Sequence, residues 1–290
     1  MAALMQRADE LTVTARKHVP GADAGFDAFQ RELTYGGGLI AGGLAYRLFL
    51  WLLPIGLVGA QSFGIWFDAD EDGLEKAAKE FGIGAAAISS AANAVEASQT
   101  NRTLLFATGV VLLAWFSLGF VRALQVAYSL AWGLPRQRLR KPLYAVVLFN
   151  GLFIMLATAG VGLAWLRAHL GLFGMLGILV TVAYQAAIAL LVMWLLPRRA
   201  ERWQELLPGA LLIAVGAQLV NVAVVFYFAP KIGRSTELYG TLGTAAVLLV
   251  WLYILARLIT SGAFLNATLW ERRYGVPPQE SAPSASGREP

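Results

Sequence analysis

The chain has 290 residues, of which 58% are hydrophobic and 14% are charged, and its formal net charge is +5. Charged residues make up about a quarter of a soluble domain, so this composition is typical of a membrane protein and excludes an ordinary soluble enzyme. The chain contains no cysteine. Disulfides, thiolate metal ligands and cysteine nucleophiles are therefore excluded as well.

The first 35 residues contain acids and no hydrophobic run, so we do not expect a cleavable secretory signal there. Phe26, Phe29 and Leu33 give this segment a short apolar face. That face suits an interfacial helix leading into the first membrane span, and a simple extension of the span is the alternative. Residues 1–35 are thus predicted to be a cytoplasmic N-terminal segment with an interfacial helix.

Six apolar stretches follow, each near or above the roughly 20 residues that a helix needs to cross a bilayer. They are Gly36–Ser62, Leu104–Trp132, Leu143–Leu166, Leu170–Leu196, Leu206–Ala229 and Leu238–Trp270. The sequence therefore predicts an all-α, polytopic integral membrane protein with six transmembrane helices over residues 36–270. The tail, residues 271–290, is rich in Pro, Ser and Gly and is predicted to be disordered in the cytoplasm.

The first stretch contains residues that favour close packing and bending. Gly38 and Gly42 are four residues apart, a spacing that lets a neighbouring helix approach closely. Pro54 is expected to kink this helix or to end a hydrogen-bonded segment. Together these residues predict a bend that could serve gating.

Residues 63–102 form the one long hydrophilic excursion, which we expect to build two short helices outside the membrane. Asp68, Asp70 and Asp72 reproduce the start of an EF-hand loop, but Lys79 stands where that loop needs a bidentate glutamate. These acids are a weak divalent-ion candidate, and a solvated acidic helix cap is the simpler interpretation. No metal site beyond this one, and no cofactor, is predicted.

Most basic residues fall on one side of the predicted membrane. That side holds Arg7, Arg16, Lys17, Arg31, Arg136, Arg138, Arg140, Lys141, Arg198, Arg199, Arg202, Arg272, Arg273 and Arg288. The other side holds Lys76, Lys79, Arg102, Arg167, Lys231 and Arg234. The positive-inside rule then predicts both termini in the cytoplasm. The net charge thus reflects topology and attraction to membrane lipids, and no nucleic-acid partner is expected.

Three arginines, Arg47, Arg122 and Arg257, lie deep inside apolar stretches, and none of the six stretches contains Asp or Glu. An ionisable group at bilayer depth costs at least about 2.5–3.5 kcal/mol, so it tends to face a partner or a water-filled cavity. Counting about 1.5 Å per residue from the cytoplasmic ends places all three at roughly 16–21 Å. They are predicted to share one layer.

The other three stretches place amides at comparable depth, namely Asn150, Gln185, Gln218 and Asn221. Each amide could instead join two helices by a hydrogen bond, and an arginine could cap carbonyls freed near Pro54. Taken together, however, the three arginines and the four amides form one polar layer, and such a layer predicts a binding site. Guanidinium groups without a neighbouring acid attract carboxylate or phosphate, so the predicted ligand is anionic or zwitterionic. The missing acids also argue against a carboxylate proton relay.

Several segments together resemble the YihY/BrkB family of bacterial inner-membrane proteins, once labelled ribonuclease BN. The resemblance rests on Ala45-Tyr46 with Pro54, Ala123-Leu124-Gln125 with Tyr128, Tyr239–Gly243, Leu249–Tyr253 and Gly262–Asn266. It implies a six-helix integral membrane protein for which transport has been proposed. Trp51 stands where the family often has serine, and Phe264 where it often has glutamate, so roles of those two groups do not carry over. The nuclease label finds no support, because His18 and His169 are predicted on opposite sides.

The sequence therefore predicts a transporter or channel-like protein for small anionic or zwitterionic solutes, and it gives no indication of oligomeric state. The three arginines would hold the solute and the four amides would orient it. An anionic-lipid handling or envelope-assembly protein is the second interpretation, and a membrane scaffold that binds partners through residues 63–102 is the third. An enzyme is not expected.

Overall fold

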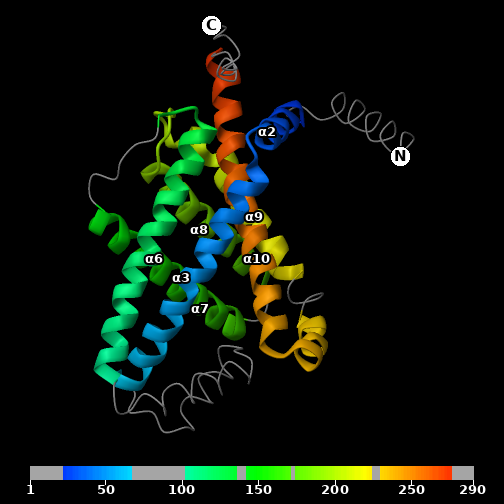
Figure 1. Ribbon diagram of the computed structural model, residues 1–290. Coiled ribbons are helices and arrows are strands. Elements are labelled where there is room, and N and C mark those ends of the chain that lie inside the picture. Colours follow the sequence, from blue (N-terminus) through cyan, green and yellow to red (C-terminus); the bar gives the residue numbers. More distant parts are fainter. Residues whose placement is uncertain (1–21, 67–101, 136–141, 171–173, 224–228, 276–290) are drawn as a thin grey trace, which may run out of the picture. The chain divides into compact units, whose positions relative to one another are not determined.

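The computed structural model describes residues 22–66, 102–135, 142–170, 174–223 and 229–275, and these residues are helical apart from short turns (Figure 1). The helices are α2 (Ala22–Thr34), α3 (Gly37–Trp66), α6 (Arg102–Ala131), α7 (Pro142–Leu170), α8 (Gly174–Leu195), the 3-10 helix η2 (Trp203–Leu206), α9 (Leu207–Ala223) and α10 (Ala229–Tyr274). The all-α prediction is confirmed for this part of the chain.

Four of the described segments are long and apolar enough to cross a membrane. They are Gly37–Gly59, Leu104–Ala131, Trp203–Asn221 and Leu248–Tyr274, and shorter apolar helices cover Pro142–Leu156 and Leu179–Leu195. Large apolar side chains on these helices are exposed, for example Leu39 at 86% and Trp115 at 74%. An apolar exterior of this kind is the expected surface of a protein surrounded by lipid.

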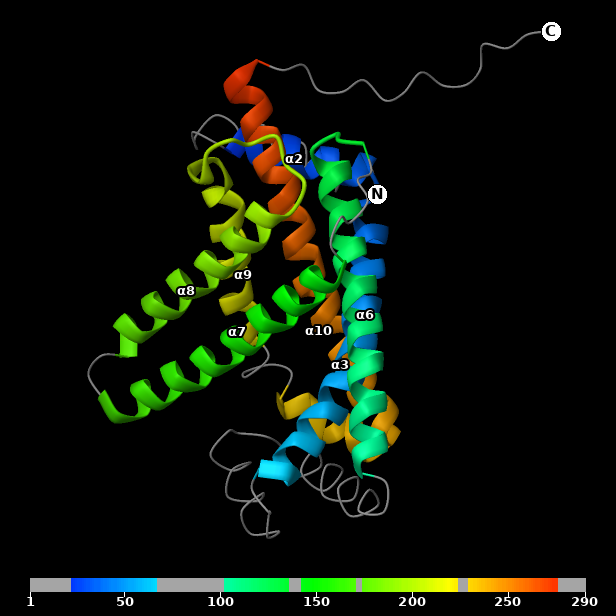
Figure 2. The ribbon, with the colours of Figure 1, turned by 90° about the vertical axis from the view of Figure 1, so that its left-hand side faces the viewer.

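The described residues divide into two compact units. The first takes its residues from 1–43, 124–138 and 182–290, and the second from 44–123 and 139–181. In the first unit, α10 packs against both α2 and α9, and Figure 2 shows α9 running beside α10. In the second unit, side chains of α3, α6 and α7 meet around the buried Trp51.

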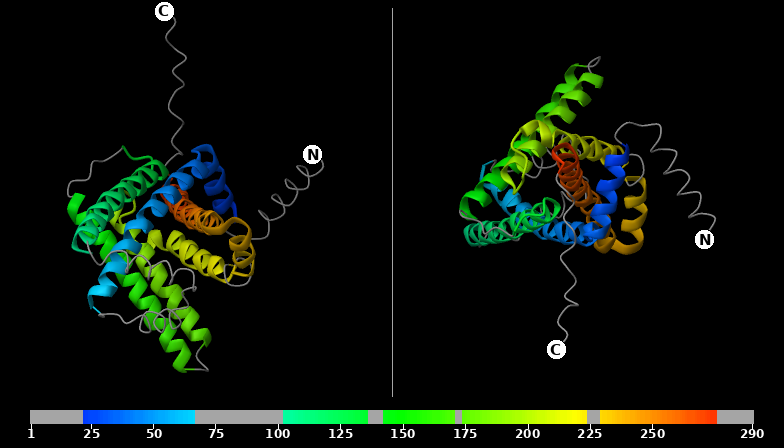
Figure 3. Two further views of the ribbon diagram at one scale, coloured as in Figure 1. Left: turned by 60° about the horizontal axis from the view of Figure 1, so that its bottom comes forward. Right: turned by 90° about the horizontal axis from the view of Figure 1, so that it is seen from above.

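Helix α2 is a separate element from α3. It ends at Thr34, and Gly36 follows with φ of 68°, a left-handed conformation that favours glycine. The interpretation of residues 26–33 as a simple extension of the first span is therefore wrong. Because the chain turns at this glycine, α2 packs instead against α10, as the view from above shows (Figure 3).

The contact between α9 and α10 depends on two glycines that face each other. A β-carbon added at Gly209 would overlap the backbone oxygen of Gly262, and one added at Gly262 would lie 3.0 Å from the oxygen of Gly209. A β-carbon at Gly216, on the same face of α9, would instead meet the flexible end of Leu258. The two helices therefore approach most closely near the start of α9.

Gly209→Ala is expected to lower the free energy of unfolding by about 1–3 kcal/mol, because a backbone atom must move to make room. Gly216→Ala is the matched control and should be close to neutral, since Leu258 can change its rotamer and alanine is the better helix former. Chemical unfolding of the purified protein in detergent compares the two. Equal losses would show that the backbone contact at Gly209 does not limit the packing.

The predicted bending residues of the first stretch behave differently from one another. Helix α3 continues through Pro54, so this proline does not end the helix. A β-carbon at Gly38 would lie 3.6 Å from the ends of two long side chains of α10, so close approach of the helix backbones there stays a prediction. A β-carbon at Gly42 would have no atom within 4 Å. The expectation of close packing at Gly42 is wrong for the described residues. The predicted disorder of residues 271–290 is wrong at its start, because α10 continues to Tyr274. Asp68, Asp70, Asp72 and residues 276–290 lie outside the described residues.

Candidate anion-binding site

Arg47 extends from α3 toward α6 within the second unit. Its Nη1 donates a hydrogen bond of 3.0 Å to the backbone oxygen of Gly119. A β-carbon at Gly119 would lie only 3.0 Å from the same nitrogen, so the glycine makes room for the guanidinium group. The Arg47 side chain is nevertheless exposed, which leaves most of its donors available.

Arg122 lies close to this contact along α6. It follows Gly119 by three residues, and residues three apart are neighbours on a helix surface. The backbone oxygen that binds the Arg47 guanidinium group therefore lies within about one turn of α6 from the Cα atom of Arg122. Arg122 is exposed, and the described residues of the second unit include no Asp or Glu. Two cationic side chains thus share one region in which the described residues supply no countercharge.

Arg257 has a different environment, in the first unit. Its Nη1 lies 3.0 Å from Oε1 of Glu32, and Ser261 donates a hydrogen bond of 2.8 Å to the other carboxylate oxygen. Glu32 is 1% exposed. The expectation that all three arginines lack an acid is therefore wrong for Arg257. The acid comes from α2, outside the apolar stretches, and its carboxylate binds both Arg257 and Ser261, which lie one turn apart on α10.

The glycines at the start of α3 fit this ion pair. A β-carbon at Gly37 would overlap the Glu32 side chain and lie 2.9 Å from its backbone oxygen. A β-carbon at Gly38 would lie 3.6 Å from both Nη1 of Arg257 and the hydroxyl of Tyr253. These glycines therefore bring Glu32 and Arg257 together, a role that the gating interpretation did not include.

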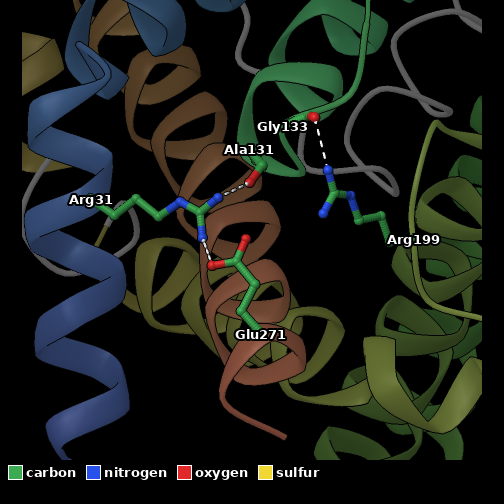
Figure 4. Close-up of polar contacts among 5 residues, drawn as sticks. All are labelled: Arg31, Ala131, Gly133, Arg199 and Glu271. Carbon is green, nitrogen blue, oxygen red and sulfur yellow. Dashed lines mark hydrogen bonds and ion pairs between the residues drawn. The ribbon is translucent and has the colours of Figure 1, made fainter. Parts of the chain in front are cut away.

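Two further ion pairs join α2 to the end of α10. Arg31 pairs with Glu271 and also donates a hydrogen bond of 3.0 Å to the backbone oxygen of Ala131 (Figure 4). Asp27 pairs with Arg272. Together with the Glu32 pair, these contacts attach the charged face of α2 to α10.

The basic residues between α8 and α9 are also part of the packing. Arg199 donates a hydrogen bond of 3.1 Å to the backbone oxygen of Gly133, which follows α6 with φ of 57° (Figure 4). A cation at this place satisfies a carbonyl group at the end of a helix. Arg198 lies over the ring of Trp194, and burial lowers the pKa of its guanidinium group. Both residues were predicted only as markers of topology.

Asn150 connects three helices of the second unit. Its amide donates to the Ser117 hydroxyl oxygen at 2.8 Å and to the backbone oxygen of Val146 at 2.9 Å. The indole of Trp51 donates to both Asn150 and Ser117, at 3.3 and 2.9 Å. The interpretation of this amide as a connection between helices fits these contacts, and Trp51 supplies part of the polar network.

The other amides lie in the first unit. Gln218 on α9 donates a hydrogen bond of 3.2 Å to Gln185 on α8, and both side chains are partly buried. Asn221, one turn further along α9, is exposed. The structure thus joins two of the predicted residues directly and leaves the third facing outward.

Sequence reasoning missed Glu32 and Asn266. Glu32 lies four residues before the first apolar stretch, so a search confined to the stretches excluded it. Its place beside the apolar face of α2, and not within that face, was the available signal. Asn266 is 1% exposed and binds Gly209, Leu206 and Met193. In the sequence, Asn266 was noted only as the last residue of the family-like segment Gly262–Asn266, and no role was predicted for it.

The described residues thus contain several helices that are long and apolar enough to cross a membrane. The protein is therefore a polytopic helical membrane protein. The family model described as virulence factor BrkB matches residues 28–287, and the chain belongs to this family, as the resemblance implied.

Two curated relatives have names that state only a membrane protein. A UPF0761 membrane protein of Stenotrophomonas maltophilia is 31% identical over 27% of this chain and 18% of its own length. One of Nitrosospira multiformis is 25% identical over 33% of this chain and 21% of its own length. The chain therefore matches only about a fifth of the length of these relatives. No solved structure matches it.

Proposed function

We propose that this protein passes small anionic or zwitterionic solutes across the bacterial inner membrane, and that Arg47 and Arg122 bind the solute. The observation that carries this proposal is that exposed Arg47 of α3 binds the backbone oxygen of Gly119, three residues before exposed Arg122 on α6, without an acid among the described residues of their unit. Arg257 is not assigned to the solute, because Glu32 already neutralises it. In this proposal the chain crosses the membrane six times, with both termini in the cytoplasm.

The chemistry of the pair supports an anionic ligand. Guanidinium groups present planar, bidentate donors that match carboxylate and phosphate oxygens. The Arg47 group is held by the Gly119 carbonyl, which lowers the cost of ordering the side chain when an anion binds. A pair of cations in a low-dielectric setting also raises the local concentration of anions.

Arg47→Gln and Arg122→Gln are each expected to reduce anion flux about tenfold or more, because each variant removes a charge-assisted hydrogen bond. Flux is measured in proteoliposomes loaded with labelled inorganic phosphate, a short-chain monocarboxylate or glycine. The double variant should approach the flux of empty liposomes.

Arg273→Gln is the matched control, because it removes one exposed positive charge at the end of α10 without touching α3 or α6. Its flux should equal that of the unmodified protein. Undiminished flux in both the Arg47 and Arg122 variants, with all proteins reconstituted equally, would contradict the proposal.

Handling of anionic lipid is a second candidate, and the surface around Arg122 favours it. Val111, Trp115 and Arg122 follow one another at helical spacing on α6, and the first two are 67% and 74% exposed. An exposed apolar stripe of this kind can face acyl chains while the arginine binds a headgroup phosphate. Mass spectrometry of the purified protein distinguishes the two candidates. Anionic lipid lost in Arg122→Gln, with flux of all three solutes unchanged, would favour lipid handling.

A further inference from the structure

Helix α2 has its apolar residues on the outside. Phe29 and Leu33 are 51% and 56% exposed, and Phe26, which is partly exposed, lies on the same helical face. Ala24 and Ala28, on the opposite face, are each 5% exposed and pack inward. The helix thus buries small residues and exposes large apolar ones.

The charged residues of α2 point the other way, toward α10. Asp27, Arg31 and Glu32 pair with Arg272, Glu271 and Arg257, respectively. A helix on the surface of a soluble protein has the reverse arrangement, with charges toward water and apolar residues toward the core. The inverted arrangement indicates that the outer face of α2 does not face bulk water.

The position of α2 identifies what that face meets. Only Tyr35 and Gly36 separate it from the membrane-length segment Gly37–Gly59, so α2 lies next to the end of a span. Leu39, in the first turn of α3, is 86% exposed and begins the apolar surface of that span. At this place along the chain the neighbouring medium is the boundary between lipid headgroups and acyl chains.

We propose that α2 lies in the plane of the bilayer surface, with Phe26, Phe29 and Leu33 inserted among the lipids and its charged face attached to α10. Side chains on such helices reach about 5–10 Å into the boundary between headgroups and acyl chains. The ion pairs fix the rotation of α2, so that the apolar face is turned away from α10. Helix α2 thereby anchors the C-terminal part of α10 to the membrane surface.

The absence of cysteine in the chain permits a direct test with single-cysteine variants. Phe29→Cys and Leu33→Cys place a polarity-sensitive fluorophore on the outer face. Thr34→Cys is the matched control, because Thr34 is also exposed on α2 but lies about 100° around the helix from Leu33. Each labelled full-length protein is reconstituted in phosphatidylcholine vesicles, with and without lipids spin-labelled near the headgroup.

Blue-shifted emission at residues 29 and 33, quenched severalfold more strongly by the spin-labelled lipids than at residue 34, is the expected result. Equal emission and equal quenching at all three positions would overturn the proposal, because the face would then be in water. Shielding at 29 and 33 without lipid quenching, accompanied by disulfide-linked dimers of Phe29→Cys under oxidation, would overturn it in favour of a second copy of this chain.

Discussion

Arg257→Gln is expected to lower the free energy of unfolding by about 3–5 kcal/mol, the usual cost of breaking a buried ion pair by removing one partner. The variant leaves the Glu32 carboxylate, whose side chain is 2% exposed, with the Ser261 hydroxyl as its remaining hydrogen-bond partner among the described residues. A buried charge without a countercharge loses its hydration and gains little in return. Unfolding of the protein in mixed micelles with increasing denaturant measures the loss.

Arg272→Gln is the matched control on the same helix. The side chains of Arg272 and its partner Asp27 are 41% and 43% exposed. Exposed ion pairs contribute about 1 kcal/mol or less to the free energy of unfolding. The double variant Glu32→Gln, Arg257→Gln should recover part of the stability, since no buried charge then remains. If Arg257→Gln costs no more than Arg272→Gln, the Glu32 pair is not buried in solution.

The outcome also separates Arg257 from the proposed anion site. Arg257→Gln is expected to reduce the amount of folded protein, whereas Arg47→Gln and Arg122→Gln are expected to reduce flux per folded molecule. The distinction follows from their environments, because Arg257 has an acidic partner and the other two are exposed in the second unit. In the sequence, the similar predicted depth of the three arginines in the membrane had assigned all of them to the anion site.

The helices could be predicted from the sequence because the signal for them is local. A run of about 20 apolar residues is sufficient to indicate a spanning helix, and each predicted stretch contains a helix among the described residues. The separation of α2 from α3 was left open, because an interfacial helix and a simple extension of the span both fitted the sequence, although Gly36 was a visible candidate for a turn. Of the glycines in this segment, Gly38 and Gly42 were interpreted as packing residues, and the left-handed conformation of Gly36 is known only from the structure.

The partners of polar side chains could not be predicted, because they come from residues far apart in the chain. Glu32 and Arg257 are separated by more than 200 residues, and an acid outside an apolar stretch gave no sign of entering the protein. Counting residues from the end of each stretch gave the depth of a side chain in the membrane. It did not give the direction in which that side chain points around the helix axis. Arg47 and Gly119 show the same limit, since the depth count carried no information about which carbonyl the arginine binds.

Asn266 illustrates how one side chain can hold three segments together. Its Oδ1 accepts a hydrogen bond of 2.8 Å from the backbone N–H of Gly209, in the first turn of α9. Its Nδ2 donates to the backbone oxygen of Leu206 at 3.0 Å and to the sulfur of Met193 at 3.3 Å. The amide therefore joins α10 to the end of α8 and to the start of α9.

Asn266→Ala is expected to lower the free energy of unfolding by about 2–5 kcal/mol, because a buried N–H and a buried carbonyl each lose a partner at about 1–3 kcal/mol. Asn221→Ala is the matched control: it truncates an exposed amide on α9 and should change the stability by less than about 0.5 kcal/mol. Asn266→Asp should fall between wild type and Asn266→Ala if the bond to Gly209 dominates, since the aspartate retains an acceptor there. A loss for Asn266→Asp larger than for Asn266→Ala would instead show that repulsion between the carboxylate and the Leu206 carbonyl outweighs that bond. Equal stability of Asn266→Ala and Asn221→Ala, measured by unfolding in the same detergent, would show that the amide does not hold α8, α9 and α10 together.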